Sequence, residues 1–146
     1  MTSPTTSTST GGSNPSAGFS AWSADTLDRF GGADEIDIST RRDDDDLRGF
    51  VPIWIVTVDN ALYVRSYRGT DGAWYRHATA RPAGAIRTAG QQADVTFTPV
   101  DPHQRDLLEA IGDAYRTKYG RYGDRYLQPM LAQHASGATL RLEART

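Results

Sequence analysis

Residues 50–67 read FVPIWIVTVDNALYVRSY and join a continuous apolar run to an alternating one. The run over 50–58 is rich in branched side chains, which predicts a central β-strand. Pro52 has no N–H to donate, so we expect the end of the strand that contains Pro52 to lie at a sheet edge or a bulge. Asp59 and Asn60 then favour a tight turn into a second strand over 62–67. The stretch therefore predicts two consecutive strands joined by a tight turn.

The second of these strands alternates between two kinds of side chain. Its two expected faces carry Leu62, Val64 and Ser66 on one side and Tyr63, Arg65 and Tyr67 on the other. Gly69 and Gly72 then break the strand, and residues 73–80 are expected to form a short helical turn. One glycine turn is thus surrounded by arginines and large aromatic side chains.

The segments on both sides show further strand and helix patterns. Strand patterns cover 36–40, 83–90, 93–100 and 138–145, and helix patterns cover 23–30, 102–119 and 126–134. Ser23 is expected to cap the first helix, Asp101 the second, and Pro129 to kink or restart the third. A helix, five strands, two helices and one strand follow each other, which favours an α+β fold with an antiparallel sheet curled into a small barrel.

The totals limit the function. The chain has 146 residues, which indicates one domain, expected over 19–146 after a disordered Ser/Thr/Gly/Pro tail over 1–18. A net charge of −2 argues against bulk nucleic-acid binding and against a polybasic membrane contact. Neither a secretory signal nor a membrane-spanning apolar run is apparent. With no cysteine, the chain has no disulfide or thiol chemistry, and we expect a cytoplasmic protein.

Residues for metal binding or nucleophilic catalysis are scattered. His77, His103 and His134 lie in different predicted elements without ligand spacing. The run 43–46 is four aspartates, but it lacks the spaced oxygen ligands and the glycine of a calcium loop, so a solvated loop is the better interpretation. No G-x-S-x-G motif occurs. The sequence therefore predicts no metal site and does not favour a hydrolase.

Two groups of arginines suggest an anion site instead. Arg41, Arg42 and Arg48 surround the turn after the first strand, and Arg65, Arg68 and Arg76 surround the glycine turn. If the strands are neighbours, these guanidinium groups could face one groove and hold phosphate or carboxylate oxygens. Alternatively, the first group simply neutralises the four aspartates. Trp74 and Tyr75 could stack a planar ring beside the arginines, or Trp74 could pack as a lid over the barrel end. Trp54 is interpreted as a core residue.

The same residues resemble a known family. Over roughly residues 36–98, short motifs make the chain similar to the split-barrel flavin-binding proteins, closest to the deazaflavin-dependent nitroreductase-like branch common in actinobacteria. The matching positions are Arg41, Arg42, Arg48, Pro52, Tyr63, Val64, Ser66, Gly69, Trp74, Pro82, Ile86 and Gly90. More narrowly, the strings LYVRS, WYR, AYRTKYG and TLRLEAR resemble a family of small bacterial proteins known only as a domain of unknown function.

The resemblance implies a six-stranded antiparallel split β-barrel with a helix pair inserted before the last strand. It also implies an FMN or deazaflavin ring lying against the barrel. Arg41, Arg42 and Arg48 would contact the phosphate, Arg65 and Ser66 would line the ring, and Trp74 would flank it. Two departures stand out, because the aspartates over 43–46 replace a short basic turn and the helix pair could cover the groove.

Two functional hypotheses follow from these residues. The first is a flavin- or deazaflavin-dependent oxidoreductase, nitroreductase-like, in which Tyr67 or Tyr75 donates a proton or hydrogen bond to the substrate. The second is a binding module without catalysis or cofactor, which holds a small anionic or aromatic ligand, or a partner subunit, in the same groove. A homodimer with the cofactor at its interface is compatible with the first hypothesis.

Overall fold

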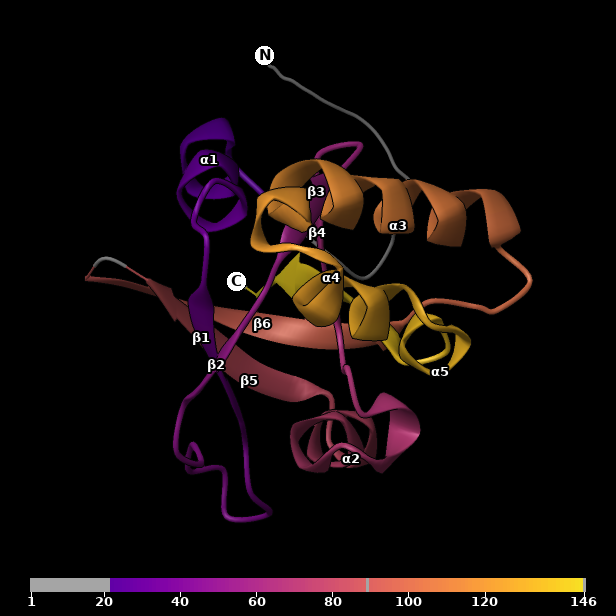
Figure 1. The fold of residues 1–146 in the computed structure, drawn as a ribbon. Helices are drawn as coiled ribbons and strands as arrows, with labels where there is room; N and C mark the ends of the chain where they lie inside the picture. The colour runs from indigo at the N-terminus through magenta and orange to yellow at the C-terminus, as the bar shows by residue number, and fades with distance from the viewer. Residues whose placement is uncertain (1–21, 89, 146) are drawn as a thin grey trace.

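Seven antiparallel strands form one sheet in the computed structural model, which describes residues 22–88 and 90–145 (Figure 1). The strands are β1 (Ile36–Thr40), β2 (Val51–Ile53), β3 (Val56–Val58), β4 (Ala61–Arg65), β5 (Ala83–Thr88), β6 (Gln91–Pro99) and β7 (Thr139–Ala144). The expected tail over 1–18 lies outside the described residues. The predicted α+β class with an antiparallel sheet is confirmed, with seven strands in place of six.

The two edge strands of this sheet are neighbours in sequence. The strand order is β2-β1-β5-β6-β7-β4-β3, and only Trp54 and Ile55 separate β2 from β3. Three peptide steps span at most about 11 Å, whereas seven strands laid flat would be roughly 29 Å wide. The sheet therefore curls until its edges approach each other, as in a barrel.

The prediction of one central strand over 50–58 is wrong. The run divides into β2, which pairs with β1, and β3, which pairs with β4 at the opposite edge. Pro52 lies on an edge strand, as expected from its missing donor. The run is apolar throughout because it crosses between the edges, where Ile55 is buried inside the barrel and Val56 faces the helices.

The tight turn and the two faces of β4 are confirmed. Asp59 and Asn60 have φ values of 50° and 65°, the conformation of a two-residue hairpin turn. Leu62 and Val64 point into the barrel interior, and Tyr63 packs on the other side of the strand.

Two apolar cores follow from this alternation. The interior core of the barrel contains Phe30, Ile36, Ile38, Ile55, Leu62, Val64, Ala78, Ile86, Val95, Phe97, Leu140 and Leu142. The outer core lies between the sheet and the helices that follow β6, and it contains Val56, Tyr63, Ile111, Tyr115, Tyr119, Leu127 and Met130. The helices that follow β6 thus pack as a layer on the outer side of β3 and β4 (Figure 1).

The first two helices cover the barrel. Helix α1 (Ala24–Gly31) starts as predicted at Ser23, whose hydroxyl accepts from Thr26 N at 3.2 Å. The 3₁₀ turn η1 (Gly69–Asp71) leads into α2 (Ala73–Ala80), which contacts β1 and β6 and buries Ala78 in the interior core.

The helical segment before the last strand has more pieces than the predicted pair. It consists of α3 (Arg105–Tyr119), η2 (Gly120–Tyr122), α4 (Asp124–Leu131) and α5 (Gln133–Ser136). The predicted cap at Asp101 is wrong, because its carboxylate accepts from His103 N at 2.8 Å within a separate turn, and α3 begins at Arg105. Pro129 lies inside α4. Among the described residues, no helix has the length and apolarity needed to cross a bilayer.

Candidate functional site

A groove of about 630 Å³ opens between the barrel and α4. We call it the aromatic groove. It is lined by Glu35, Val51, Pro52, Ile53, Trp54, Arg65, Ser66, Tyr67, Arg68, Gly72, Ala73, Trp74, Arg125, Tyr126, Pro129 and Met130. A smaller hollow of about 330 Å³ shares Glu35, Trp54 and Tyr126 with it. The crossover from β2 to β3, the end of β4, the start of α2 and one face of α4 therefore meet here.

Trp54 forms a rigid wall of the groove. Its ring stacks on Tyr119 with centroids 4.0 Å apart and planes 1° from parallel. Tyr119 also holds the neighbouring backbone, because its hydroxyl accepts from Ile55 N at 3.0 Å and donates to Asp34 O at 2.7 Å. Trp54 is half-buried, packs against the outer core and also lies 5.7 Å from the Tyr122 ring centroid, so the interpretation as a core residue holds in part.

Trp74, Tyr67 and Tyr126 supply the remaining aromatic surface. Trp74 packs partly against the interior core and stands edge-on to Tyr75 at 6.3 Å. It therefore lines the groove while it packs against the interior core, and its stacking on a planar ring stays a prediction. Tyr67 and Tyr126 are 56% and 58% exposed and flank the groove mouth.

Ser66 and Gly72 form a closely packed part of the lining. Ser66 is 2% exposed, and its N–H donates to Ala138 O at 3.1 Å. A Cβ on Gly72 would lie 2.3 Å from Ser66 Oγ, so a side chain at this position would force the Ser66 hydroxyl to move. His134 Nε2 lies 2.6 Å from Tyr67 O and connects this turn to α5. The backbone beside the groove is thus held from two sides.

Arg65 is the buried cation of the site. It is 3% exposed and donates to three neutral oxygens: Thr139 Oγ1 at 3.0 Å, Met130 O at 3.1 Å and Leu108 O at 2.9 Å. Its guanidinium lies 5.6 Å from the Tyr115 ring centroid. Burial is the main cause that lowers the pKa of Arg65. Among the described residues, no carboxylate forms an ion pair with it.

The three arginines of the 41–48 turn lie elsewhere. Arg41 donates to Asp45 O at 2.7 Å and pairs with Asp94 at 3.3 Å. Arg42 is exposed. Arg48 is half-buried near His77, whose pKa is lowered by burial first and by Arg48 second. Within the described part of the chain, none of the three lines the aromatic groove, so the structure does not bring them to Arg65, Ser66 and Trp74.

The reason lies in the topology of the turn. The loop between β1 and β2 projects from the sheet on the side away from α3 (Figure 1). It is held at its own end of the barrel by Arg81, which pairs with Asp45 and donates to Arg42 O. The carboxylate of Asp45 is thus paired with Arg81 and not with the turn arginines, contrary to the alternative from the sequence. The phosphate role of Arg41, Arg42 and Arg48 remains a prediction.

Sequence reasoning missed the contribution of α4 to the groove. Arg125, Tyr126, Pro129 and Met130 line it, and no local motif marks them apart from an arginine and a tyrosine side by side on an amphipathic helix. Arg68 was noted in the sequence but not chosen as a site residue. Tyr67 lines the groove and accepts from Arg68 Nε at 3.3 Å.

Tyr75, the other proton-donor candidate, does not line the groove within the described residues. It is half-buried against the interior core, and burial raises its pKa.

The chain belongs to the DUF2255 family, described as uncharacterized proteins conserved in bacteria, whose family model matches residues 26–142. The resemblance to a bacterial family of unknown function is thereby confirmed. A comparison with curated proteins finds no match.

Several solved structures share the fold. An F420-H2 dependent reductase (FDR-A) has a TM-score of 0.54 at 16% identity, over 75% of this chain and 94% of its own. A FAD-binding protein from Mesorhizobium loti has a TM-score of 0.54 at 12% identity, over 86% and 91%. The heme storage protein HutZ from Vibrio cholerae has a TM-score of 0.55 at 12% identity, over 84% and 90%. At these identities the likeness shows the fold alone, a curled antiparallel sheet with helices that resembles the split barrels.

Proposed function

We propose that the aromatic groove binds a flavin-type cofactor, FMN or a deazaflavin, and that the chain acts as an oxidoreductase of that class. The observation that carries the proposal is the groove itself, in which two indole rings border a mostly apolar space beside three arginines. Its volume of about 630 Å³ lies in the usual range for a small-molecule site.

The lining suits a flat ring with an anionic tail. Trp54 is held parallel to Tyr119, lies near Tyr122 with ring centroids 5.7 Å apart, and lines the groove, and Trp74 borders the space from α2. Arg68 and Arg125 line the groove and remain charged at any working pH. We assign them to the phosphate or carboxylate of the tail, in place of the turn arginines.

The chain's own residues would position the cofactor and exclude water. A bound flavin-type ring supplies hydride transfer to or from the substrate. Pro129 and Met130 would cover the ring from α4, and Ser66 and Arg65 would line it on the barrel side. The Tyr67 hydroxyl, beside Arg68, is the candidate donor of a proton or hydrogen bond to the substrate.

The groove lining, more than the comparisons, favours a flavin-type ligand over heme. Two of the similar structures are described as an F420-dependent reductase and a FAD-binding protein, and one as a heme storage protein. Within the described residues, the groove lining contains no histidine, the commonest axial ligand of heme. The second hypothesis, a binding module that holds its ligand without catalysis, uses the same residues and differs only in turnover.

A titration of the purified protein with FMN, F420 and hemin tests the proposal. We expect quenching of FMN or F420 fluorescence at micromolar protein and no comparable hemin binding. Reduction of the bound cofactor by a nicotinamide donor, or oxidation of reduced F420 by a nitroaromatic acceptor, then separates enzyme from binding module. Absence of binding by FMN and F420 would overturn the cofactor proposal. Light scattering on the same samples measures whether the chain is a homodimer.

A further inference from the structure

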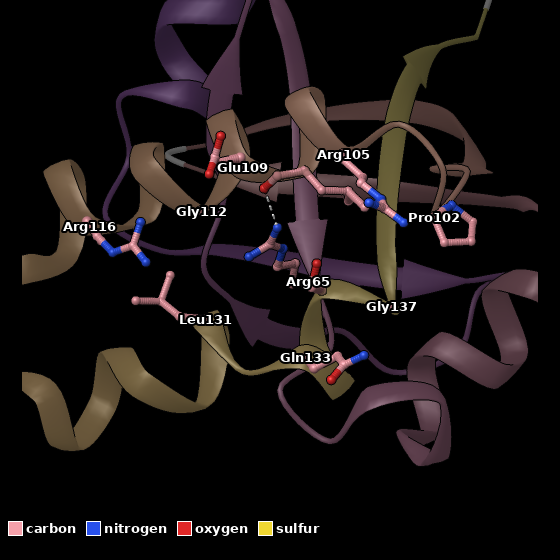
Figure 2. A pocket seen from close by; sticks show the side chains of 11 residues that line it. Arg65, Pro102, Arg105, Glu109, Gly112, Arg116, Leu131, Gln133 and Gly137 are labelled. Atoms are coloured by element: carbon pink, nitrogen blue, oxygen red, sulfur yellow. Dashed lines mark hydrogen bonds between the residues drawn. The ribbon is translucent and has the colours of Figure 1, made fainter.

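A second cavity lies on the other side of Arg65. It has a volume of about 510 Å³ and opens between α3 on one side and the end of α4 with α5 on the other. We call it the polar cleft. Figure 2 shows the Arg65 guanidinium between the helices, with Arg105 and Arg116 on either side and Gln133 below. Helix α3 lines the cleft and not the aromatic groove, and among the described residues Arg65 is the one that lines both.

Arg65 retains donors for a ligand in this cleft. A guanidinium has five N–H groups, and the described residues accept three of them, one each from Nε, Nη1 and Nη2. All three acceptors are neutral, so the positive charge has no counter-charge in contact with it. Burying a charge without a counter-ion is unfavourable, and an anion placed against the two remaining N–H groups would remove this cost.

Gly112 keeps the approach to Arg65 open. It lies in the interior of α3, where glycine is less favourable than alanine. A Cβ at this position would lie 3.7 Å from Arg65 Nη1 and 3.8 Å from Leu131 Cδ2, which is ordinary contact. Alanine would therefore fit, and it would stabilise the helix. A ligand that occupies the space beside the Arg65 guanidinium would explain why position 112 is a glycine.

The charges of the cleft lining are mostly positive. Residues 105, 109, 112 and 116 recur at helical spacing on one face of α3 and place Arg105, Glu109 and Arg116 around the opening. Arg116 pairs with Asp113 at 2.7 Å, and Arg105 forms no ion pair among the described residues. With Arg65, three cations face one carboxylate in the cleft.

We infer that the polar cleft is a binding site for a small oxyanion, a carboxylate or a phosphate, whose oxygens accept from the free N–H groups of Arg65. Arg65 recognises the anion from the floor of the cleft, Arg105 attracts it at the rim, and Gly112 provides the space. The site shares Arg65 with the proposed cofactor groove but has otherwise its own lining, so anion binding can be measured in the absence of flavin.

The test is calorimetric titration of the whole chain with inorganic phosphate and, separately, with succinate. We expect one of the two to bind with a dissociation constant below about 1 mM, and the anion that binds identifies the chemistry. In parallel, the ¹⁵N signal of Arg65 Nε, which donates to Thr139 in the core, is followed by NMR and is expected to shift on saturation.

Two matched variants on α3 complete the test. Gly112→Ala should weaken the anion roughly tenfold, because its methyl group would lie 3.7 Å from Arg65 Nη1 and block about one charge-assisted hydrogen bond to the anion, while the melting temperature stays equal or rises. Gly120→Ala, at the end of the same helix with open space around its Cβ, should bind as the wild type does. The site is overturned if neither anion binds, if the Arg65 signal stays still, or if Gly112→Ala binds as tightly as Gly120→Ala.

Discussion

The aromatic groove and the polar cleft share one buried cation and differ in their other walls. On the groove side, Arg65 shares the lining with tryptophan, tyrosine and methionine side chains from α2, α4 and two connecting segments. On the cleft side it lies among the charged residues of one face of α3. A single guanidinium thus has one neighbourhood that suits a flat ring and another that suits a small anion.

The largest predicted effect is the loss of stability when Arg65, which lines both cavities, is replaced. Arg65→Met leaves Leu108 O, Met130 O and Thr139 Oγ1 without their donor, so we expect the free energy of unfolding to fall by about 3 kcal/mol. Arg29→Met is the control, since it breaks only an exposed i,i+4 pair with Asp25 and should cost about 0.5 kcal/mol or less. Urea unfolding measures both. If Arg65→Met and Arg29→Met lost the same free energy of unfolding, Arg65 would not be a structural link between the two cavities.

A change in one wall separates the two cavities. Trp74→Leu keeps an apolar side chain against the interior core but removes the indole plane. We expect FMN or F420 affinity to fall by about 1.5 kcal/mol, or roughly tenfold, while phosphate or succinate binding stays unchanged. The two titrations described above measure this. A loss of both ligands would show that the cavities behave as one site.

The cations that hold the cofactor tail can be distinguished by substitution. Arg68→Gln and Arg125→Gln should each weaken an anionic cofactor by about 1 kcal/mol. Arg41→Gln and Arg48→Gln should leave its affinity unchanged, because neither residue lines the groove among the described residues. Fluorescence titration at two salt concentrations measures all four. Larger losses of affinity for Arg41→Gln and Arg48→Gln than for Arg68→Gln and Arg125→Gln would mean that the phosphate binds at the 41–48 turn, as the sequence predicted.

The smallest predicted effect is on the pH dependence of stability. It involves Lys118, which holds the backbone beside Trp54 in the groove wall. Lys118 Nζ donates to Ile55 O at 2.7 Å and to Gly31 O at 2.8 Å, and burial lowers its pKa to about 8. Between about pH 8 and pH 10 the unfolded chain keeps a proton that the folded chain has released, so stability should rise modestly with pH. Above pH 10 the raised pKa of Tyr119 acts in the opposite direction.

Lys118→Met should remove this rise, which denaturant unfolding at several pH values detects. An unchanged slope in the variant would mean that Lys118 is not the titrating group. The polar cleft provides the comparison, because Lys118 does not line it and Gly112→Ala should keep the wild-type slope.

Local chemistry predicted the local structure well. Ser23 caps α1, Asp59 and Asn60 form the hairpin turn, and Leu62 and Tyr63 point to opposite sides of β4. In each case the decisive interactions lie within a few residues, so a pattern or a turn preference is enough.

The division of 50–58 between two sheet edges could not be predicted in this way. An apolar run looks the same whether it is one central strand or crosses between edges, because only long-range pairing with β1 and β4 separates the two. The separation of the 41–48 arginines from Arg65, Ser66 and Trp74 could not be predicted for a similar reason. Arg41 and Arg68 occur in similar Arg- and Gly-containing turns, yet the turn at Arg41 is held by Asp94 and Arg81 at another end of the barrel.

The account depends most on a ring binding between Trp54 and Trp74. The chain has three tryptophans, so three indole N–H signals can be followed by NMR during titration with FMN or F420. Trp22 serves as the internal control, because its Nε1 donates to Leu142 O at 2.9 Å and it does not line the groove. The account predicts that the Trp54 and Trp74 signals shift while Trp22 stays in place. The account is contradicted if the Trp54 and Trp74 signals do not shift at saturating cofactor, or if only the Trp22 signal shifts.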